Sequence, residues 1–388
     1  MNVVLGDFDN HKRFLPLTFT RPVADIRCGI FTFRERWEFF LKNKISILTQ
    51  EYLQKKYPTN FDSKNIIINP LFLPDKELVE LILSLKNEKL VYNNKIIAYT
   101  FDNNEVEKIP DKEKQIFGNP FFIEKITDIF TKNGELIKYD FDLITKGRNS
   151  AGLSSTNIVF GKYPVFVEEG CFVECTTLNT NEGPIYLGKN SVVMEGANIR
   201  GPFALCEDSE VKMGAKIYSN TTIGPVCKVG GEINNSVFFG FSNKAHDGFL
   251  GNSIIGEWCN LGADTNNSNL KNNYAEVKIW SYEHERFVNS GLQFCGLIMG
   301  DHSKSGINTM FNTGTVVGVS SNIFGAGFPR NFIPSFSWGG YEKMTEFKLN
   351  SAFDVMEKVM SRRNVKLSDV DKEIFSHIFN ITASYRRY

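Results

Sequence analysis

The chain has 388 residues, 42% of them hydrophobic, and this length predicts more than one folding domain. Its 44 basic and 44 acidic residues balance, so the sequence lacks the positive charge of a dedicated nucleic-acid-binding protein. The N-terminus carries no basic and apolar leader, and no apolar run approaches the length of a bilayer span. We therefore expect a cytoplasmic protein that binds neither nucleic acid nor membrane.

The N-terminal part of the chain, residues 1–150, is predicted to form an α/β domain. It opens with a short apolar strand (MNVVLGD), and strand-like runs then alternate with helix-like segments. The expected strands are Ile66–Ile68 and Lys95–Tyr99, and the expected helices are Phe33–Lys42 and Lys76–Lys86. This alternation favours a central sheet covered by helices. A stretch rich in Gly and Ser, residues 147–155, predicts a linker.

The second predicted domain, residues 151–338, has a period of six residues. Every sixth residue from the first ladder position is aliphatic: Leu187, Val193, Ile199, Leu205, Val211, Ile217, Ile223 and Val229. Neither a helix with 3.6 residues per turn nor a strand with a period of two produces this spacing. The pattern predicts a parallel β-helix with three flat sides per coil. Equivalent residues of successive coils would then stack into inward ladders about 4.8 Å apart.

The six-residue period is interrupted twice, around residues 232–249 and 266–294. It returns at Met299, Phe311, Val317 and Ile323, with Ser305 at an intervening position. Insertions in a solenoid lie on its surface and often carry function. We therefore expect residues 266–294 to leave the coil as a loop, and we expect the active site near the two interruptions.

The C-terminal segment, residues 339–388, is predicted to be helical. The basic pair Arg362-Arg363 ends a first helix, and a second helix begins after Ser368. Apolar residues recur along both helices: Phe347, Phe353, Val355, Met356, Val370, Ile374, Ile378 and Ile381. The expected role is a cap on the open end of the solenoid.

The segment LPLTFTRP (Leu15–Pro22) resembles the start of sugar-phosphate nucleotidyltransferases. In that family a Gly-rich loop precedes an Arg-x-x-Pro-Leu-Thr segment and wraps the nucleotide phosphates. Arg13 and Thr18 match that segment, and Arg21 is a further candidate for nucleotide binding. The Gly-rich half is missing, because the preceding residues supply only Gly6. The resemblance implies a retained fold with weakened or altered transferase chemistry, in which Mg²⁺ is needed only if this site is active.

The six-residue repeat resembles the left-handed β-helix of hexapeptide acyltransferases, and the expected handedness comes from that resemblance. The segments NKAHDGFLGN (Asn243–Asn252) and NLGADT (Asn260–Thr265) are similar to the acetyltransferase half of the bacterial bifunctional enzymes that make UDP-N-acetylglucosamine. The chain looks like a divergent branch of that family with a shortened nucleotidyltransferase domain. Family members assemble with active sites between neighbouring β-helices, which implies a homotrimer.

Carried over residue by residue, the resemblance implies an acetyltransferase site. His246 falls on the family's catalytic histidine, which can remove the proton of an amino sugar so that the neutral amine attacks acetyl-CoA. Asn260 falls on the asparagine that contacts the amino sugar, and Ala263 falls where the backbone meets the thioester. Lys228 aligns with an arginine that holds the sugar phosphate. Lys244, beside His246 in the matched motif, is a further substrate-binding candidate.

Three positions depart from the family pattern. Phe249 stands where the family has a substrate-binding tyrosine, Asn234 replaces a lysine that would bind the sugar phosphate, and Asn269 is followed by Leu270 where the family has a second tyrosine. Phe249 and Asn269 are the two candidate substrate contacts kept from this group. The lost polar groups are compatible with a different acceptor sugar.

Three residues of the returning coils are candidates for acetyl-CoA binding. His302 either lines a coenzyme channel or lies on the surface. Lys304 and Arg330 either meet coenzyme A phosphates as point charges or are solvated. Some β-helices of this type are zinc enzymes that use a close pair of histidines, but the histidines here are too widely spaced, so we expect no metal site.

Three functions remain open from the sequence. The first is an acetyl-CoA-dependent N-acetyltransferase acting on an amino-sugar phosphate such as glucosamine 1-phosphate, in nucleotide-sugar biosynthesis. The second is a bifunctional enzyme that also transfers a nucleotidyl group through its N-terminal domain. The third is a non-catalytic binding or scaffold protein. Intact His246, Asn260 and Ala263 favour the first two, and the missing Gly-rich loop favours the first over the second.

Overall fold

The computed structural model describes residues 2–388, and the chain divides into two compact units. The first unit runs to Phe14 and continues over Thr20–Ile26 and Phe31–Ile126. The second unit contains Leu15–Phe19, Arg27–Ile30 and Thr127–Tyr388. The boundary predicted near residue 150 differs from this division, because the helices that precede the linker pack on the solenoid.

The first unit is built on a six-stranded mixed sheet. The strand order is β2-β1-β3-β5-β4-β6. The strands are β1 (Asn2–Gly6), β2 (Ser46–Leu48), β3 (Lys64–Ile68), β4 (Lys89–Tyr92), β5 (Lys95–Asp102) and β6 (Glu113–Gln115). β1 pairs in parallel with β2 and β3, and β5 runs antiparallel to β3 and β4. Leu5, Ile66 and Ile68 face a core that also holds Trp37 and Ile82 from the two helices.

The helices of the first unit begin at capping residues that the sequence supplies. In α1 (Phe33–Leu41), the Thr32 side chain accepts a hydrogen bond from the backbone N–H of Glu35. In α2 (Lys76–Leu83), Asp75 accepts one from Leu78. These bonds satisfy N–H groups that have no partner within the helix. Three short 3₁₀ helices complete the unit: η1 (Phe8–Phe14), η2 (Val23–Asp25) and η3 (Glu51–Leu53). The predicted α/β domain is confirmed.

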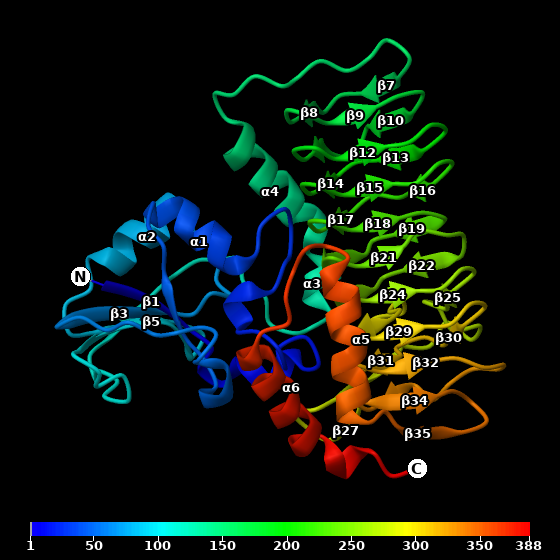
Figure 1. Cartoon of the computed structure of the whole chain (residues 1–388). Helices are drawn as coiled ribbons and strands as arrows, with labels where there is room; N and C mark the ends of the chain where they lie inside the picture. The colour runs from blue at the N-terminus through cyan, green and yellow to red at the C-terminus, as the bar shows by residue number, and fades with distance from the viewer. Residues whose placement is uncertain (1) are drawn as a thin grey trace. The chain divides into compact units, whose positions relative to one another are not determined.

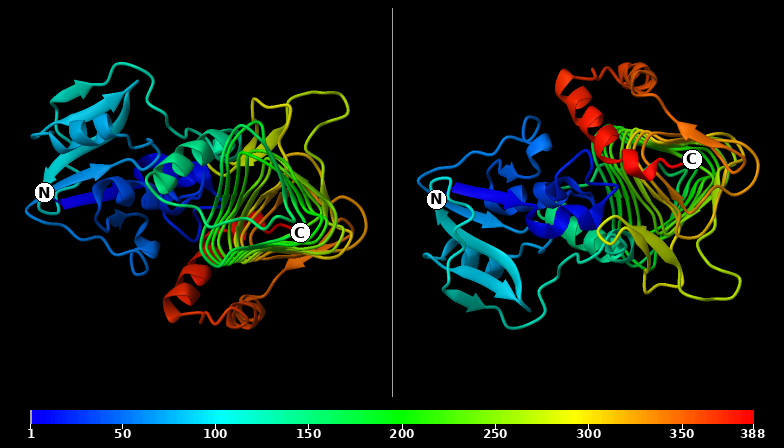
Figure 2. Two further views of the ribbon diagram at one scale, coloured as in Figure 1. Left: turned by 90° about the horizontal axis from the view of Figure 1, so that it is seen from above. Right: turned by 90° about the horizontal axis from the view of Figure 1, so that it is seen from below.

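The second unit contains a parallel β-helix whose coils stack one upon another (Figure 1). Viewed along the stack, the coils superimpose as a three-sided outline (Figure 2). Each side is one parallel sheet, and successive strands of the chain occupy the three sides in turn. The predicted fold class, an α/β N-terminal domain joined to a parallel β-helix of hexapeptide repeats with C-terminal helices, is confirmed.

We name the three sides A, B and C in the order in which the chain visits them. Side A comprises β7 (Ile158–Gly161), β10 (Thr177–Thr180), β13 (Asn198–Arg200), β16 (Lys216–Ile217), β19 (Glu232–Asn234) and β22 (Phe249–Gly251), continued by the pair β25 (Asn266–Asn267) and β30 (Met310–Phe311). Side B comprises β8 (Val165–Val167), β11 (Ile185–Leu187), β14 (Phe203–Leu205), β17 (Thr221–Ile223), β20 (Val237–Gly240), β23 (Ile254–Glu257), β28 (Ile298–Met299), β31 (Val316–Val317) and β33 (Phe332–Ile333). Side C comprises β9 (Phe172–Val173), β12 (Val192–Val193), β15 (Glu210–Val211), β18 (Lys228–Val229), β21 (Asn243–Lys244), β24 (Asn260–Leu261), β29 (Lys304–Ser305), β32 (Asn322–Ile323), β34 (Ser337–Gly339) and β35 (Met344–Glu346).

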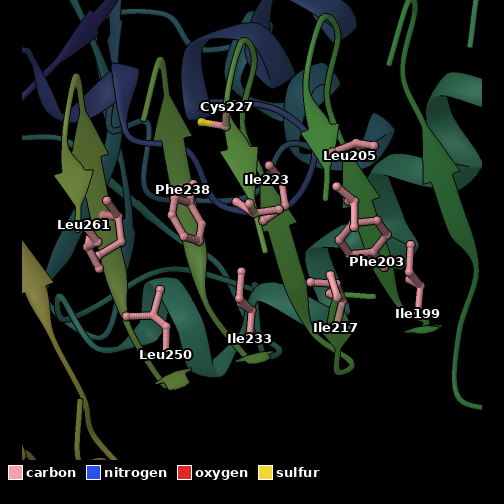
Figure 3. Close-up of a cluster of buried hydrophobic side chains, with 14 of the residues drawn as sticks. Ile199, Phe203, Leu205, Ile217, Ile223, Cys227, Ile233, Phe238, Leu250 and Leu261 are labelled. Atoms are coloured by element: carbon pink, nitrogen blue, oxygen red, sulfur yellow. The ribbon is translucent and has the colours of Figure 1, made fainter. Parts of the chain in front are cut away.

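The inward ladder predicted from the sequence forms the core of the solenoid (Figure 3). All eight aliphatic residues of the regular repeat are buried, as are the returning positions Met299, Phe311, Val317 and Ile323. Figure 3 shows Leu205, Ile223 and Phe238 as consecutive rungs on side B. A buried aliphatic side chain contributes about 1.5–3 kcal/mol relative to its exposed state, so the ladder is the main source of stability in this unit.

The first interruption of the period is a shortened coil that stays within the solenoid. In the regular part, eighteen residues separate Val211 from its neighbour Val229 in the next coil. Only fifteen residues separate Val229 from Lys244. The loss of phase around residues 232–249 therefore reflects a shorter coil and not an insertion, and β19, β20 and β21 continue the three sides.

The second interruption leaves the coil, as predicted. Residues 278–289 form an antiparallel hairpin of β26 (Lys278–Ser281) and β27 (Arg286–Asn289). The Trp280 ring stacks on Phe332 with a centroid separation of 4.1 Å, and the Tyr282 ring meets Phe332 edge-on at 5.6 Å. These aromatic contacts fix the hairpin against the strand β33.

Helices cover sides B and C of the solenoid. α3 (Asp128–Thr131) leads into α4 (Asn133–Thr145), whose residues Ile137 and Phe141 pack with Ala204 and Cys206 on the outer surface of side B. The C-terminal helices α5 (Leu349–Ser361) and α6 (Asp369–Ile381), followed by η4 (Ala383–Tyr385), contact the flank of the last coils. Their ring contacts are Trp338–Phe347, His302–Phe375 and Phe336–Phe379.

This flank position differs from the cap that the sequence predicted for residues 339–388. His302 and Phe336 of the last coils are buried where Phe375 and Phe379 of α6 contact their rings. None of the helices in the described part of the chain is long and apolar enough to cross a bilayer.

We predict that Ile223→Ala lowers the free energy of unfolding by about 2–5 kcal/mol, since Ile223 is fully buried between two rungs of the ladder. Urea denaturation followed by far-UV circular dichroism measures the change. Lys216→Ala, at an exposed position of the adjacent coil side, is the matched control and should change stability by less than about 0.5 kcal/mol. Equal effects of the two substitutions would contradict the ladder as the source of stability.

Candidate active site

A column of polar side chains runs along the outer surface of side C. The paired strands bring Lys228, Asn243, Asn260 and Lys304 into consecutive rungs, followed by Asn322. Neighbouring rungs of a parallel sheet are about 4.8 Å apart, so each side chain lies within reach of the next. Three of these residues, Lys228, Asn260 and Lys304, were candidate site residues from the sequence. The structure brings them onto one face.

The ammonium group of Lys228 is already occupied by a carboxylate. Its Nζ lies 2.5 Å from Oε1 of Glu210, and Lys212 contacts the other carboxylate oxygen. The lysines are the main reason that the pKa of Glu210 stays below its usual value despite partial burial. An anionic ligand at Lys228 would have to compete with Glu210. This position is therefore a weaker phosphate contact than the sequence predicted.

Asn260 and Lys304 line a cavity of about 260 Å³, which we call the Asn260 cavity. The rings of Phe241 and Trp258, stacked 4.2 Å apart, form one wall. Residues Arg362 and Arg363, which follow α5, complete the lining together with Val359. Burial lowers the pKa of Lys304 to about 8, and its Nζ donates a hydrogen bond to the carbonyl of His302 at 2.9 Å.

The two arginines of this cavity were missed as site residues by the sequence analysis. They had been assigned only to the end of a helix, which is the ordinary role of basic residues at that position. No local pattern indicates that the end of α5 lies over Asn260. To predict that these arginines lie over Asn260, one must know that α5 packs on side C, and the periodicity of the sequence does not specify this.

His246 occupies the turn between sides C and A. Its side chain is exposed, and its ring makes no hydrogen bond within residues 2–388. The coil below supplies Gly230 and Gly231 at this turn, and a Cβ on Gly231 would lie 2.9 Å from the carbonyl oxygen of His246. With a φ of 73°, Gly231 permits this close passage.

The coil above His246 supplies Ala263. Asp264 N–H donates to the carbonyl of Asp247 at 3.0 Å, so the turn of Ala263 lies directly over the turn of His246. Gly230 and Gly231 of the coil below therefore pass close under the backbone of this turn, and Ala263 belongs to the turn stacked above it. The structure therefore places the predicted general base and the predicted thioester contact at the same turn of consecutive coils.

Lys244 lies inside the solenoid, which corrects its predicted role in substrate binding. It is 0% exposed and takes the inward rung between Val229 and the position of Leu261. Its Nζ donates to the carbonyl of His246 at 2.9 Å and approaches the carbonyl of Gly230 at 3.4 Å. Because the coil is shortened here, a lysine fills a position that is aliphatic in most other coils and polar again only at Ser305. Lys244 therefore holds the backbone of the His246 turn from within.

Phe249 and Asn269 lie on side A. The Asn269 amide donates to the Asn252 side chain at 2.8 Å, and both the Phe249 ring and the Asn269 amide border Gly251. The backbone N–H of Phe249 donates to Asn266 at 2.7 Å. These two candidate substrate contacts are thus adjacent to each other. They lie on a different side of the prism from Asn260 and Lys304.

His302 is held between protein groups, which does not match a role in binding coenzyme. It is 4% exposed, and its ring stacks near Trp258 at 5.9 Å and meets Phe375 of α6 edge-on at 5.2 Å. Arg330 is exposed and lines a separate cavity of about 750 Å³. That cavity is bordered by Lys278 and Phe287 of the hairpin. The structure does not gather the four predicted coenzyme contacts into one cavity.

The segment that resembles nucleotidyltransferases is divided between the two units. Arg13 and Arg21 belong to the first unit and Thr18 to the second. Arg13 donates to the Asn10 side chain at 3.1 Å, within the 3₁₀ helix η1 that follows β1. The family's Gly-rich loop would start at this position. Nucleotide binding by these three residues remains a prediction.

Asp7, at the carboxyl end of β1, was not singled out by the sequence. It is 3% exposed and accepts hydrogen bonds from the Thr49 hydroxyl at 2.5 Å and the Val23 backbone at 2.8 Å. Burial raises its pKa to about 7. Among residues 2–388, no group of three or more His, Cys, Asp or Glu side chains is arranged to hold a metal ion. Through these two hydrogen bonds Asp7 joins the end of β1 to the segments of Thr49 and Val23 within the first unit.

Comparisons with known proteins describe the two parts of the chain separately. Residues 3–149 match a family model described as sugar nucleotidyl transferase. No protein of curated function matches the chain in sequence.

Solved structures similar to the chain include three transferases. The polysialic acid O-acetyltransferase OatWY is 13% identical, with a TM-score of 0.26 over 49% of this chain and 87% of that one. The UDP-N-acetylglucosamine acyltransferase of Arabidopsis is 15% identical, with a TM-score of 0.21 over 61% and 82%. The polySia specific acetyltransferase NeuO is 16% identical, with a TM-score of 0.17 over 50% and 87%.

We predict that Lys244→Met increases the free energy of unfolding at pH 7, by about 1–3 kcal/mol. Burial lowers the pKa of Lys244 from 10.5 to about 8, so a charged lysine at this rung costs about 3 kcal/mol, partly offset by its two hydrogen bonds. Between pH 8 and 10.5 the folded state has released this proton and the unfolded state has not. The free energy of unfolding of the wild type therefore rises relative to that of the variant as the pH increases through this range.

Urea denaturation of wild type and Lys244→Met at a series of pH values measures how the difference between their free energies of unfolding narrows. Lys228→Met, on the outer surface of the preceding coil, is the matched control and should show no such window. A variant that is less stable than wild type at every pH would mean that the hydrogen bonds of Lys244 outweigh its desolvation.

We also predict that Asp7→Asn stabilises the first unit at neutral pH. Between the usual pKa of 3.8 and the raised pKa of about 7, the folded state binds a proton that the unfolded state releases, so stability falls as pH rises. The advantage of the asparagine should grow from pH 4 to pH 7, towards about 4 kcal/mol. Urea midpoints across that range test it. Asp9→Asn, at an exposed neighbouring position, should give a constant difference.

Proposed function

We propose that this chain is an acetyl-CoA-dependent N-acetyltransferase whose acceptor is an amino-sugar phosphate, with His246 as general base. The observation that carries the proposal is the His246 turn. An exposed imidazole is bordered by Gly230 and Gly231 below and by Ala263 above, and its backbone is held by Lys244 from inside the prism. In the proposal, the acceptor and the thioester meet at this exposed ring.

The chemistry that this arrangement supports is direct acetyl transfer. An amino sugar carries an ammonium group for much of the time at neutral pH, and only the neutral amine can attack a thioester. The neutral fraction, whose ammonium proton has passed to solvent, attacks the thioester, and His246 accepts one of the two remaining N–H protons as the nitrogen–carbon bond forms. The carbon–sulfur bond then breaks, and the imidazolium returns the proton to the departing thiolate of coenzyme A. General base catalysis of this kind contributes about 10²–10⁴-fold to rate.

Asn260 and the cationic lining of its cavity support a phosphorylated sugar as the acceptor. Asn260 projects from side C, one rung from Lys304, and the Asn260 cavity contains three basic residues and no carboxylate. In the proposal, Asn260 contacts the sugar. Ala263 contributes a backbone contact to the thioester.

The resemblance to the bifunctional family adds an assembly to this proposal. Its members place the active site between neighbouring β-helices, so we include a homotrimer. Analytical ultracentrifugation of the protein used in the assay gives the number of chains. A cytoplasmic location belongs to the same proposal.

A second candidate function, transfer of a nucleotidyl group, is favoured by the match of residues 3–149 to the sugar nucleotidyl transferase family model. It would require Mg²⁺, a nucleoside triphosphate and a sugar 1-phosphate. Pyrophosphate release from UTP and N-acetylglucosamine 1-phosphate, with and without Mg²⁺, tests it separately. A protein that shows neither activity would be a binding or scaffold protein.

We predict that His246→Gln lowers kcat for acetyl transfer by about 10²–10⁴-fold with little change in stability, because the exposed ring has no structural partner. The assay follows free thiol released from acetyl-CoA in the presence of glucosamine 1-phosphate. His284→Gln, at an exposed histidine of the hairpin, is the matched control and should retain full activity. Undiminished turnover in His246→Gln would exclude the histidine as the base.

A further inference from the structure

The Asn260 cavity combines two sets of basic groups that come from distant parts of the chain. Lys304 projects from β29 on side C, and Arg362 and Arg363 come from the end of α5. No carboxylate is among the lining residues. Within residues 2–388, neither arginine has an ion pair, and the Lys304 ammonium bonds only to a backbone carbonyl. This concentration of unneutralised positive charge favours an anion.

A tight turn fixes the two arginines over side C. The carbonyl of Met360 accepts hydrogen bonds from the backbone N–H groups of Arg363 at 2.9 Å and Val365 at 3.1 Å. Asn364 adopts a left-handed conformation, with a φ of 57°, which reverses the chain direction immediately after the pair. Met360 itself is buried against the solenoid. The backbone that carries the guanidinium groups is therefore preorganised, which reduces the entropy lost on binding a ligand.

The Asn260 amide completes the donor set of the cavity. Asn243 and Asn260 occupy adjacent rungs, and the Asn260 side chain makes no hydrogen bond in the described part of the chain. The carboxamide oxygen of Asn243 is buried without a partner, and because a carbonyl oxygen only accepts, it would take a hydrogen bond from a ligand hydroxyl and not bind a phosphoryl oxygen. Amide N–H groups and guanidinium forks are the donors that phosphoryl oxygens take in proteins. A volume of about 260 Å³ is sufficient for a phosphoryl group and the atoms that join it to a sugar or a nucleotide.

Basic residues at the end of a helix usually complement its carbonyl groups, and that role alone would explain Arg362 and Arg363. It does not explain why Lys304 and two carboxamides line the same cavity without an acidic partner. It also does not explain the contrast with Lys228, which lies three rungs from Lys304 on the same side and is neutralised by Glu210.

We propose that Lys304, Arg362 and Arg363 form a phosphoryl-binding subsite over Asn260. This subsite deepens the proposed function and rests on it for the identity of the ligand, which is either the phosphate of the acceptor sugar or a phosphate of coenzyme A. The C-terminal helices thereby contribute directly to ligand recognition. These three residues then supply the positive charge for phosphate binding that the sequence analysis assigned to Lys228.

The test is equilibrium binding to the full chain by isothermal titration calorimetry. The probes are glucosamine 1-phosphate, unphosphorylated glucosamine, coenzyme A and 3′-dephospho-coenzyme A. We expect the double variant Arg362→Ala/Arg363→Ala to lose at least tenfold in affinity for a phosphorylated probe. The matched control, Lys358→Ala/Lys366→Ala, removes the same charge from exposed positions on and beside α5 and should bind like wild type.

The pattern of losses identifies the source of the phosphate. A loss for glucosamine 1-phosphate assigns the subsite to the acceptor. A loss for coenzyme A that is absent for the dephospho form assigns it to the 3′-phosphate, and an equal loss for both forms assigns it to the diphosphate. The conservative variant Arg362→Lys/Arg363→Lys keeps the charge and should recover part of the affinity, which separates recognition from a folding defect.

Two results would overturn the subsite. One is a wild-type protein that binds none of the phosphorylated probes, and the other is a double variant that binds them as tightly as the control. Failure of the proposed function has a different signature, because phosphorylated probes would bind through the arginines while no thiol is released from acetyl-CoA.

Discussion

Stacking of the solenoid coils in register is the constraint on which the rest of the structure depends. Each short strand pairs with the strand one coil away, so the neighbours of any residue are set by coil length and not by proximity in sequence. Inward positions form the ladder that excludes water, and outward positions form columns of side chains about 4.8 Å apart. His246 and Ala263 meet at one turn for this reason, although seventeen residues separate them. Asn260 and Lys304 are neighbours for the same reason.

The rung occupied by Lys244 shows what this constraint costs. A buried ammonium group in a column of aliphatic side chains is unfavourable unless hydrogen bonds and charges compensate it. Two backbone carbonyls accept from it, and the carboxylates of Asp247 and Asp264 favour its charged form. The compensation is centred on the His246 turn. Strain or desolvation that persists in a folded protein often marks a functional position, and the turn held by Lys244 carries the proposed base.

The ladder could be read from the sequence because one physical requirement, an apolar side chain every six residues, fixes both the period and the fold. The same reasoning failed where coil length changes. Between Val229 and Lys244 the coil contains fifteen residues, so a lysine that looked exposed in the motif turns inward. The sequence also could not predict that Arg362 and Arg363 line the Asn260 cavity. The amphipathic faces of α5 and α6 predict that the helices pack on an apolar surface, but they do not specify which side of the prism receives them.

Side A carries the positions that depart from the family pattern. Side C carries the positively charged positions. Phe249, which lacks the tyrosine hydroxyl, and Asn269, which precedes the second replaced tyrosine, border Gly251 on side A. The unneutralised cations lie on side C beneath the end of α5. A ligand at the His246 turn stands between these two surfaces, because that turn joins side C to side A. Loss of hydroxyl contacts on one surface, together with new cationic contacts on the other, would shift recognition from the sugar ring towards its phosphate. The acceptor would then be selected by the position of its phosphate more than by its hydroxyl pattern.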